Sequence, residues 1–191
     1  MNVKDFKHYV NENYEDKYFY HGTPHVFNSF DMSKVGTGDG LSKYGFGLYF
    51  ASTVAAAKHY AEDLTIGNLR GSGYNLYTVR LTRLAEYVEW EDSLDDSRIR
   101  RVCHILERAG FEENADEILD EYRSYGDYTM DSLYAVVAST VGSEKQASDI
   151  MYKADIVGVI ADHMFLDCKV YVAFSDQNIK IINSEQLSFV K

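Results

Sequence analysis

Short stretches rich in aromatic and β-branched residues at both ends of the chain predict β-strands. These stretches lie at residues 18–21, 46–51, 74–81, 156–160, 169–174 and 179–182. The clearest is YNLYTVRL at 74–81, which alternates with the period of two that is typical of a half-buried strand. A glycine-rich stretch from Asp31 to Gly45 separates the first two strands and predicts a loop there.

The middle of the chain follows a helical period instead. Apolar residues from Ile99 to Ala109 recur every three or four positions, so they fall on one face of a helix that Gly110 ends. Further helices are predicted at residues 53–64, 115–122 and 133–141.

Strand-rich ends therefore surround a helical segment at about 84–150. This order of elements predicts an α+β fold. We expect residues 1–191 to form a single domain in which the helical segment is an insertion.

Composition narrows the class of protein. The chain has 191 residues, of which 46% are apolar, with 16 Tyr and 10 Phe, as expected for one soluble globular domain. No apolar run approaches the roughly 18 residues that a membrane span needs. The start, MNVKDFKHYV, has no signal-peptide stretch, so we expect a cytoplasmic protein without a membrane partner.

Charge is concentrated in the helical segment. Residues 84–150 carry 17 acidic and 6 basic side chains, whereas the rest of the chain carries 13 of each. The overall net charge is −11, which argues against a nucleic acid as the main partner because phosphate contacts need clustered Lys and Arg. The acidic segment is either a solvated helical face or a docking surface for a basic protein, and the residues do not separate the two.

The motif YHGT at 20–23 is the first candidate for chemistry. His21 followed by Gly22 at a strand end places an imidazole beside a backbone that a planar ligand can approach closely. The peptide N–H and C=O there can serve as a paired donor and acceptor. Because His-Gly pairs are common in turns, a plain turn is the better explanation of this motif when it is taken alone.

Two tyrosines form the second candidate. In GFGLYFAS at 45–52, the alternation of a strand turns Tyr49 away from Leu48 and Phe50. Tyr60 follows eleven residues later on the predicted helix, which can return it over the strand end. Two such rings on either side of a flat cationic heterocycle would form a stacking clamp. Each tyrosine alone fits a core aromatic.

Together, HGT, a glycine-rich loop, G-x-G-x-Y-F-A and A-x-x-Y-A resemble the ADP-ribosyltransferase fold. The resemblance is to the branch of poly(ADP-ribose) polymerases and diphtheria-type toxins, and to small ADP-ribosyltransferase domains in phage and mobile-element proteins. The stretch YVAFSDQNIKII at 171–182 resembles the closing strand of that family. The resemblance covers about residues 18–83 and 154–182, and it implies an ADP-ribosyltransferase-like split β-sheet core with an acidic helical insertion.

The resemblance also implies that NAD is the substrate. His21 would bond a ribose hydroxyl, the backbone of Gly22 would hold the nicotinamide carboxamide, and the stretch from Asp31 to Gly45 would cover the dinucleotide. Tyr49 and Tyr60 would sandwich the nicotinamide. The implied NAD-binding residues are His21, Gly22, Thr23, Gly47, Tyr49 and Tyr60. The implied reaction cleaves the nicotinamide–ribose bond and passes the ribose to an acceptor.

Two positions depart from the family pattern. A serine that bonds the carboxamide is replaced by Ala57, and the glutamate of the closing strand is replaced by Val170. Asp167 and Asp176, near the ends of that strand, are the candidates to supply a carboxylate. The implied catalytic residues are then His21, Tyr49 and Asp167.

Three functions remain open on this basis. The first is an NAD-dependent mono-ADP-ribosyltransferase with an unknown acceptor, the second an NAD glycohydrolase, and the third a non-catalytic module that binds NAD or ADP-ribose. A metal site is not expected, since the spacing of His163 and Cys168 fits no standard zinc pattern.

Overall fold

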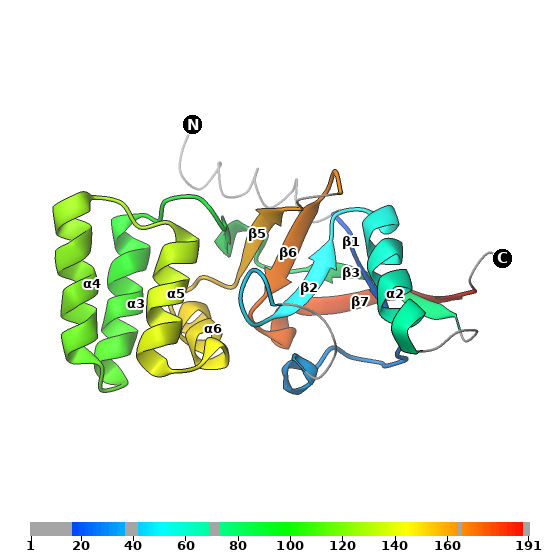
Figure 1. The fold of residues 1–191 in the computed structure, drawn as a ribbon, viewed down its shortest axis with the longest axis horizontal. Helices are drawn as coiled ribbons and strands as arrows, with labels where there is room; N and C mark the ends of the chain where they lie inside the picture. Colours follow the sequence, from blue (N-terminus) through cyan, green and yellow to red (C-terminus); the bar gives the residue numbers. More distant parts are fainter. Residues whose placement is uncertain (1–16, 37–41, 69–72, 164–165, 189–191) are drawn as a thin grey trace.

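The computed structural model of the protein describes residues 17–36, 42–68, 73–163 and 166–188, with side chains left undescribed at 63–68. Part of the predicted glycine-rich loop, including Gly38 and Gly40, lies outside these residues. The strands are β1 (Phe19–Thr23), β2 (Leu48–Ala51), β3 (Tyr74–Leu81), β4 (Tyr87–Glu89), β5 (Gly158–Asp162), β6 (Lys169–Ala173) and β7 (Ile179–Leu187). The helices are α2 (Val54–Asn68), α3 (Asp96–Arg108), α4 (Glu112–Tyr125), α5 (Met130–Val141) and α6 (Glu144–Lys153) (Figure 1).

The described strands form one mixed sheet in the order β4-β5-β6-β2-β1-β3-β7. Only the pair β4 and β5 is parallel, and the other neighbours in this sheet are antiparallel. This arrangement confirms the predicted α+β class. The stretch predicted to be helical differs in detail, because Tyr87–Glu89 forms an edge strand and the helices run from Asp96 to Lys153.

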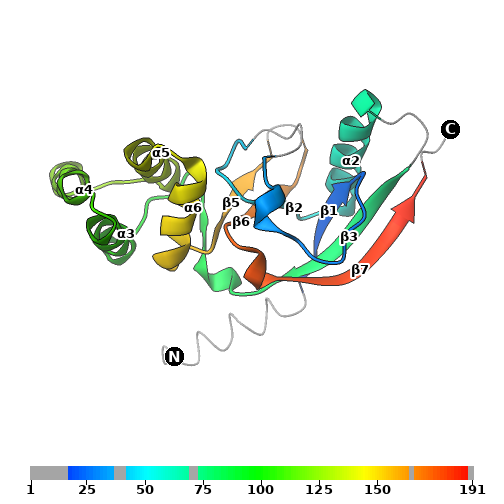
Figure 2. The same cartoon turned by 90° about the horizontal axis from the view of Figure 1, so that it is seen from below.

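Helix α2 covers one face of the sheet over β1 and β3 (Figure 2). Ala56 and Ala57 of the helix pack against Ala51 and Leu76 of the strands, and these small side chains let the helix lie close to the sheet. Gly22 continues this close approach on β1, which explains why a residue without Cβ stands there.

Helices α3 to α6 gather beside the other half of the sheet (Figures 1 and 2), and we call them the helical body. Their apolar core continues onto Val159, Val170 and Val172 of β5 and β6. The helical body therefore packs against the sheet through a shared apolar core. In the described ranges, no helix has both the length and the apolar character needed to cross a bilayer.

The sheet opens between β1 and β2. Strand β1 pairs with β3 over five residues, but with β2 only through Tyr20 and Ala51. Beyond that pair, His21 and Gly22 of β1 are not paired with β2. This opening is the feature of the fold that positions the candidate site.

Gly22→Ala tests the packing of α2 on β1. An added Cβ would lie 2.0 Å from the carbonyl oxygen of Ala57 and 2.8 Å from the Cβ of Ala61. Because the oxygen belongs to helix backbone, we expect the free energy of unfolding in urea to fall by about 3 kcal/mol. Val26→Ala, at a position that is 77% exposed, is the control and should change it by less than about 0.5 kcal/mol. Equal stability of the two variants would contradict this packing.

Candidate functional site

His21 stands where β1 leaves β2. Its Nδ1 lies 2.9 Å from the backbone oxygen of Tyr49, so a side chain bridges the two strands where the ladder has ended. A carbonyl oxygen only accepts hydrogen bonds, so Nδ1 carries the proton and Nε2 of the neutral ring is an acceptor. Burial lowers the pKa of His21 and keeps the ring neutral near pH 7, although the bond to Tyr49 opposes this shift.

Aromatic rings hold the His21 imidazole in place. The ring centroids of Phe27, Phe30 and Phe50 lie 6.3, 5.2 and 5.9 Å from that of His21. These contacts fix the plane of the imidazole and with it the direction of Nε2.

Tyr49 points to the opposite face from its neighbours in β2, as its alternation predicts. Leu48 and Phe50 pack into the aromatic cluster around His21, whereas Tyr49 packs against the core of the helical body. Its hydroxyl accepts from the N–H of Tyr44 and donates to the carbonyl of Gly45, each at 2.9 Å. Burial raises the pKa of this phenol, so Tyr49 offers a fixed neutral ring and not a base.

Tyr60 lies on α2 and is 38% exposed. The edge of the His163 ring meets the Tyr60 ring at a centroid distance of 5.4 Å and an angle of 82°. Burial, with smaller contributions from Cys168 and Tyr44, raises the pKa of Tyr60 to about 12. Among the rings that the structure describes, those of Tyr49 and Tyr60 do not touch each other.

Packing accounts for several of the other residues assigned to the NAD-binding set. Gly47 is also tightly placed, because a Cβ there would lie 2.6 Å from the carbonyl oxygen of Ala173. The Thr23 hydroxyl accepts from the N–H of His25 at 3.3 Å and so shapes the turn after β1. These contacts explain the residue types without a ligand.

The position that the resemblance assigns to the family glutamate is apolar and closed. Val170 is 2% exposed and pairs with Ala51 on one side and Ala161 on the other. Asp167 is exposed on the loop before β6, next to Cys168. Asp176 is engaged elsewhere, since its Oδ2 accepts from the N–H of Met32 at 3.0 Å. Of the two candidate carboxylates, Asp167 is therefore the exposed one.

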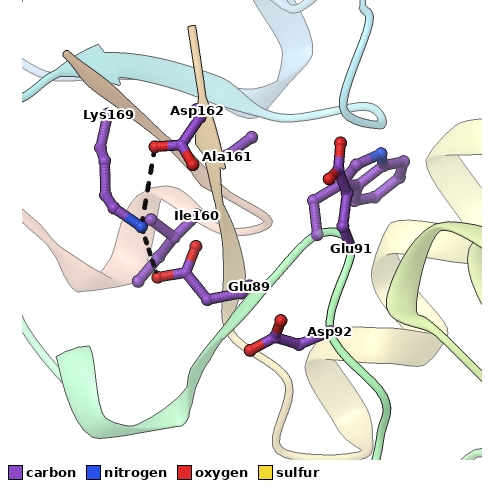
Figure 3. A pocket seen from close by; sticks show the side chains of 8 residues that line it. Glu89, Glu91, Asp92, Ile160, Ala161, Asp162 and Lys169 are labelled. Atoms are coloured by element: carbon purple, nitrogen blue, oxygen red, sulfur yellow. Dashed lines mark hydrogen bonds and ion pairs between the residues drawn. The ribbon is translucent and has the colours of Figure 1, made fainter. Parts of the chain in front are cut away.

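A pocket of about 320 Å³ lies beyond Tyr44, at the β4–β5 edge of the sheet. Its lining consists of Glu89, Trp90, Glu91, Asp92, Ile160, Ala161, Asp162 and Lys169 (Figure 3). The Nζ of Lys169 lies between carboxylates of Glu89, at 2.8 Å, and Asp162, at 3.8 Å. Sequence analysis placed Glu89, Glu91 and Asp92 in the acidic segment, as part of a solvated face or a docking surface. No three His, Cys, Asp or Glu side chains in the described part of the chain are grouped to hold a metal ion.

Tyr44 is the residue near the site that sequence reasoning missed. Its ring meets Trp90 edge-on at 6.1 Å, and its hydroxyl donates to the backbone oxygen of Asp162 at 3.0 Å. Because its N–H also donates to the hydroxyl of Tyr49, Tyr44 lies between Tyr49 and the acidic pocket. No motif marked it, because its partners are 5, 46 and 118 positions away in the chain.

The lowered pKa of His21 predicts a loss of stability in acid. The unfolded chain binds a proton near pH 6.5, whereas the folded protein resists protonation until a lower pH. The contribution of His21 is therefore fully present above pH 6.5 and is lost as the pH falls from there toward the folded pKa. We expect urea unfolding between pH 7.5 and 5 to show a shallower loss for His21→Gln than for the wild type. Burial also lowers the pKa of His163, but both proteins contain His163, so it does not contribute to the difference between their slopes. Identical slopes would contradict the neutral state of the half-buried His21.

Comparison with known proteins shows the family to which the chain belongs. The family model described as ADP-ribosyltransferase in polyvalent proteins matches residues 11–189, a range that includes the helical body. No curated protein and no solved structure matches the chain. The match covers almost the whole sequence and agrees with the resemblance of its motifs. The chain belongs to the family of ADP-ribosyltransferase domains of polyvalent proteins.

Proposed function

We propose that the protein is an NAD-dependent mono-ADP-ribosyltransferase whose site lies at the opening between β1 and β2. The observation that carries this proposal is the His21–Tyr49 bond, at 2.9 Å, across that opening. It joins the imidazole of His21 to the backbone of the β2 residue that carries the Tyr49 ring, and Gly22 follows His21 on β1. These groups match a ribose hydroxyl, a carboxamide and a pyridinium ring.

The residues fit the parts of NAD in a definite way. Nε2 of His21 accepts a hydrogen bond from a ribose hydroxyl, because Nδ1 is already the donor to Tyr49. The peptide of Gly22 offers an N–H and a C=O to the carboxamide. Tyr49 and Tyr60 take the two faces of the nicotinamide, where the positive ring gains stacking and cation–π attraction.

In the proposed reaction, the bond between the nicotinamide nitrogen and the ribose carbon breaks. Its electron pair neutralises the pyridinium, so neutral nicotinamide leaves and the ribose becomes oxocarbenium-like. The acceptor then attacks this carbon and releases its proton. The contribution of the protein is to orient the reactants and to stabilise the developing charge.

The carboxylate that stabilises the developing charge decides between this function and its alternatives. With Val170 in place of the family glutamate, we assign charge stabilisation to Asp167, the exposed carboxylate before β6. If Asp167 activates only water, the protein is an NAD glycohydrolase. If no carboxylate acts, it is a module that binds NAD or ADP-ribose without turnover.

Incubation with NAD labelled in its adenylate half separates these functions. Label on a macromolecule supports transfer, free ADP-ribose with nicotinamide supports hydrolysis, and saturable binding without either product supports the binding module. Asp167→Asn should reduce turnover without loss of NAD binding if Asp167 acts as assigned. Absence of both binding and products would overturn the proposed function.

We also propose that the acidic face of the helical body docks a basic acceptor protein. Several acidic residues there are satisfied locally, since Arg98 pairs with Asp95 and Arg100 with Asp96. Glu113 and Glu117 lie one helical turn apart on α4, and both are exposed. Their carboxylates give α4 a negative face that a basic partner fits.

The double variant Glu113→Gln/Glu117→Gln tests this docking. We expect it to weaken binding of poly-lysine about threefold and to flatten the salt dependence of that binding. The thermal midpoint should stay within about 2 °C of the wild type. Unchanged binding at low salt would show that the acidic face is only solvated.

A further inference from the structure

The loop that leads into β2 is held by the helical body. The N–H of Phe46 donates to the hydroxyl of Tyr134 at 2.9 Å, and the carbonyl of Phe46 accepts from the hydroxyl of Ser148 at 2.6 Å. Tyr134 comes from α5 and Ser148 from α6. Both polar groups of one loop residue are therefore satisfied by side chains about 100 positions away in the chain.

These bonds close into a ring. The hydroxyls of Tyr134 and Ser148 lie 2.9 Å apart. Because Ser148 donates its proton to the carbonyl of Phe46, the Ser148 oxygen can accept from Tyr134. The carbonyl of Glu144, which can only accept, also lies 2.9 Å from the hydroxyl of Tyr134, so Tyr134 shares its single proton between Ser148 and Glu144. Ser148 is 0% and Tyr134 is 5% exposed, so water does not compete for these bonds.

Packing reinforces this contact at Gly45. Gly45 has a φ of +89°, and a Cβ on it would lie 2.8 Å from Cζ of the Tyr134 ring. The loop therefore lies directly on that ring, in a conformation that favours glycine.

The backbone of the same loop also holds the hydroxyl of Tyr49. The hydroxyl of Tyr49 donates to the carbonyl of Gly45 and accepts from the N–H of Tyr44. A continuous path of bonds thus runs from α5 and α6 through residues 44–46 to the ring assigned to one face of the nicotinamide.

We propose that Tyr134 and Ser148 are positioning residues for Tyr49, which makes the helical body part of the framework of the NAD site. This proposal rests on the proposed function, because it assigns Tyr49 to nicotinamide. Neither residue touches the substrate in this account. They act by holding the loop that holds the Tyr49 hydroxyl.

Tyr134→Phe and Ser148→Ala test the proposal through NAD kinetics. Each removes a hydroxyl from the closed ring and takes its hydrogen-bond partner from a part-buried backbone group of Phe46. We expect KM for NAD to rise about tenfold with a smaller change in kcat. Ser148→Thr, which restores a hydroxyl, should recover KM in part, and Tyr125→Phe on the surface of α4 should leave it unchanged. A KM like that of the wild type in both hydroxyl deletions would overturn the proposal.

A double-mutant cycle distinguishes positioning from a general loss of stability. Tyr49→Phe removes the bond between the ring and the loop, so Tyr134→Phe should have less than about half its effect on KM in that background. Full additivity of the two changes would contradict the proposed path. The free energy of unfolding in urea, measured on all four proteins, shows whether any loss of KM simply follows stability.

A second readout does not depend on NAD. The NMR signals of ring-labelled Tyr49, assigned by their loss in Tyr49→Phe, should shift in Tyr134→Phe and stay in place in Tyr125→Phe. Unshifted Tyr49 signals in Tyr134→Phe would overturn the positioning role whatever the enzyme does. If these signals shift but the wild type neither binds nor turns over NAD, the positioning stands and the proposed function fails.

Discussion

Tyr49→Ala is expected to lower kcat/KM for NAD by about 100-fold or more, since stacking and cation–π attraction together contribute about 3 kcal/mol. The variant removes the ring assigned to one face of the nicotinamide. Tyr49→Phe keeps that ring but loses the two hydroxyl bonds to Tyr44 and Gly45, so it should lose only about tenfold.

The matched control for this series is Tyr125→Ala, which removes a tyrosine that is 80% exposed on α4. It should keep kcat/KM within about twofold of the wild type. Urea unfolding at the assay temperature shows whether each variant is folded. If Tyr49→Ala is folded and as active as Tyr125→Ala, the stacking role of Tyr49 is wrong.

His21→Ala is expected to have an effect of similar size, about 100-fold in kcat/KM. It removes the acceptor at Nε2 and also the bond that joins β1 to Tyr49 across the opening of the sheet. His21→Gln keeps a polar side chain and should fall between His21→Ala and the wild type.

His25→Ala is the control for His21→Ala. His25 is an exposed histidine four positions later in the chain, outside the aromatic cluster around His21. The ratio of kcat/KM for the two alanine variants measures the specific contribution of His21. A ratio near one would show that His21 is not part of the site. The proposed function would then lose the observation on which it depends, the bond between His21 and Tyr49.

Local periodicity was enough to predict most of the sheet and the side on which Tyr49 lies. Residues 74–81 form β3 as expected, and the alternation in β2 does turn Tyr49 away from Phe50. Both results follow from the period of two in a strand, which the sequence displays directly.

Long-range hydrogen bonding and the shortest strand were not predictable in this way. Strand β4 has three residues, too few to show a period, and its parallel partner β5 lies about 70 positions later. The contacts of Tyr134 and Ser148 with Phe46 join a helical pattern to a loop, and no local signal marks them.

The same contacts change the interpretation of the helical segment. The resemblance of the motifs leaves this segment out and implies an insertion, whereas the family match runs through it from 11 to 189. Its core is continuous with β5 and β6, and its hydroxyls bind the loop before Tyr49. The helical body therefore shares a core with the sheet and also holds the loop before β2.

A crystal structure with a non-hydrolysable NAD analogue tests the central claim most directly. The account predicts the nicotinamide between the rings of Tyr49 and Tyr60, its carboxamide on the Gly22 peptide and a ribose hydroxyl at Nε2 of His21. An analogue bound elsewhere, such as in the acidic pocket beside Trp90, or one that leaves either tyrosine ring without contact, would contradict it.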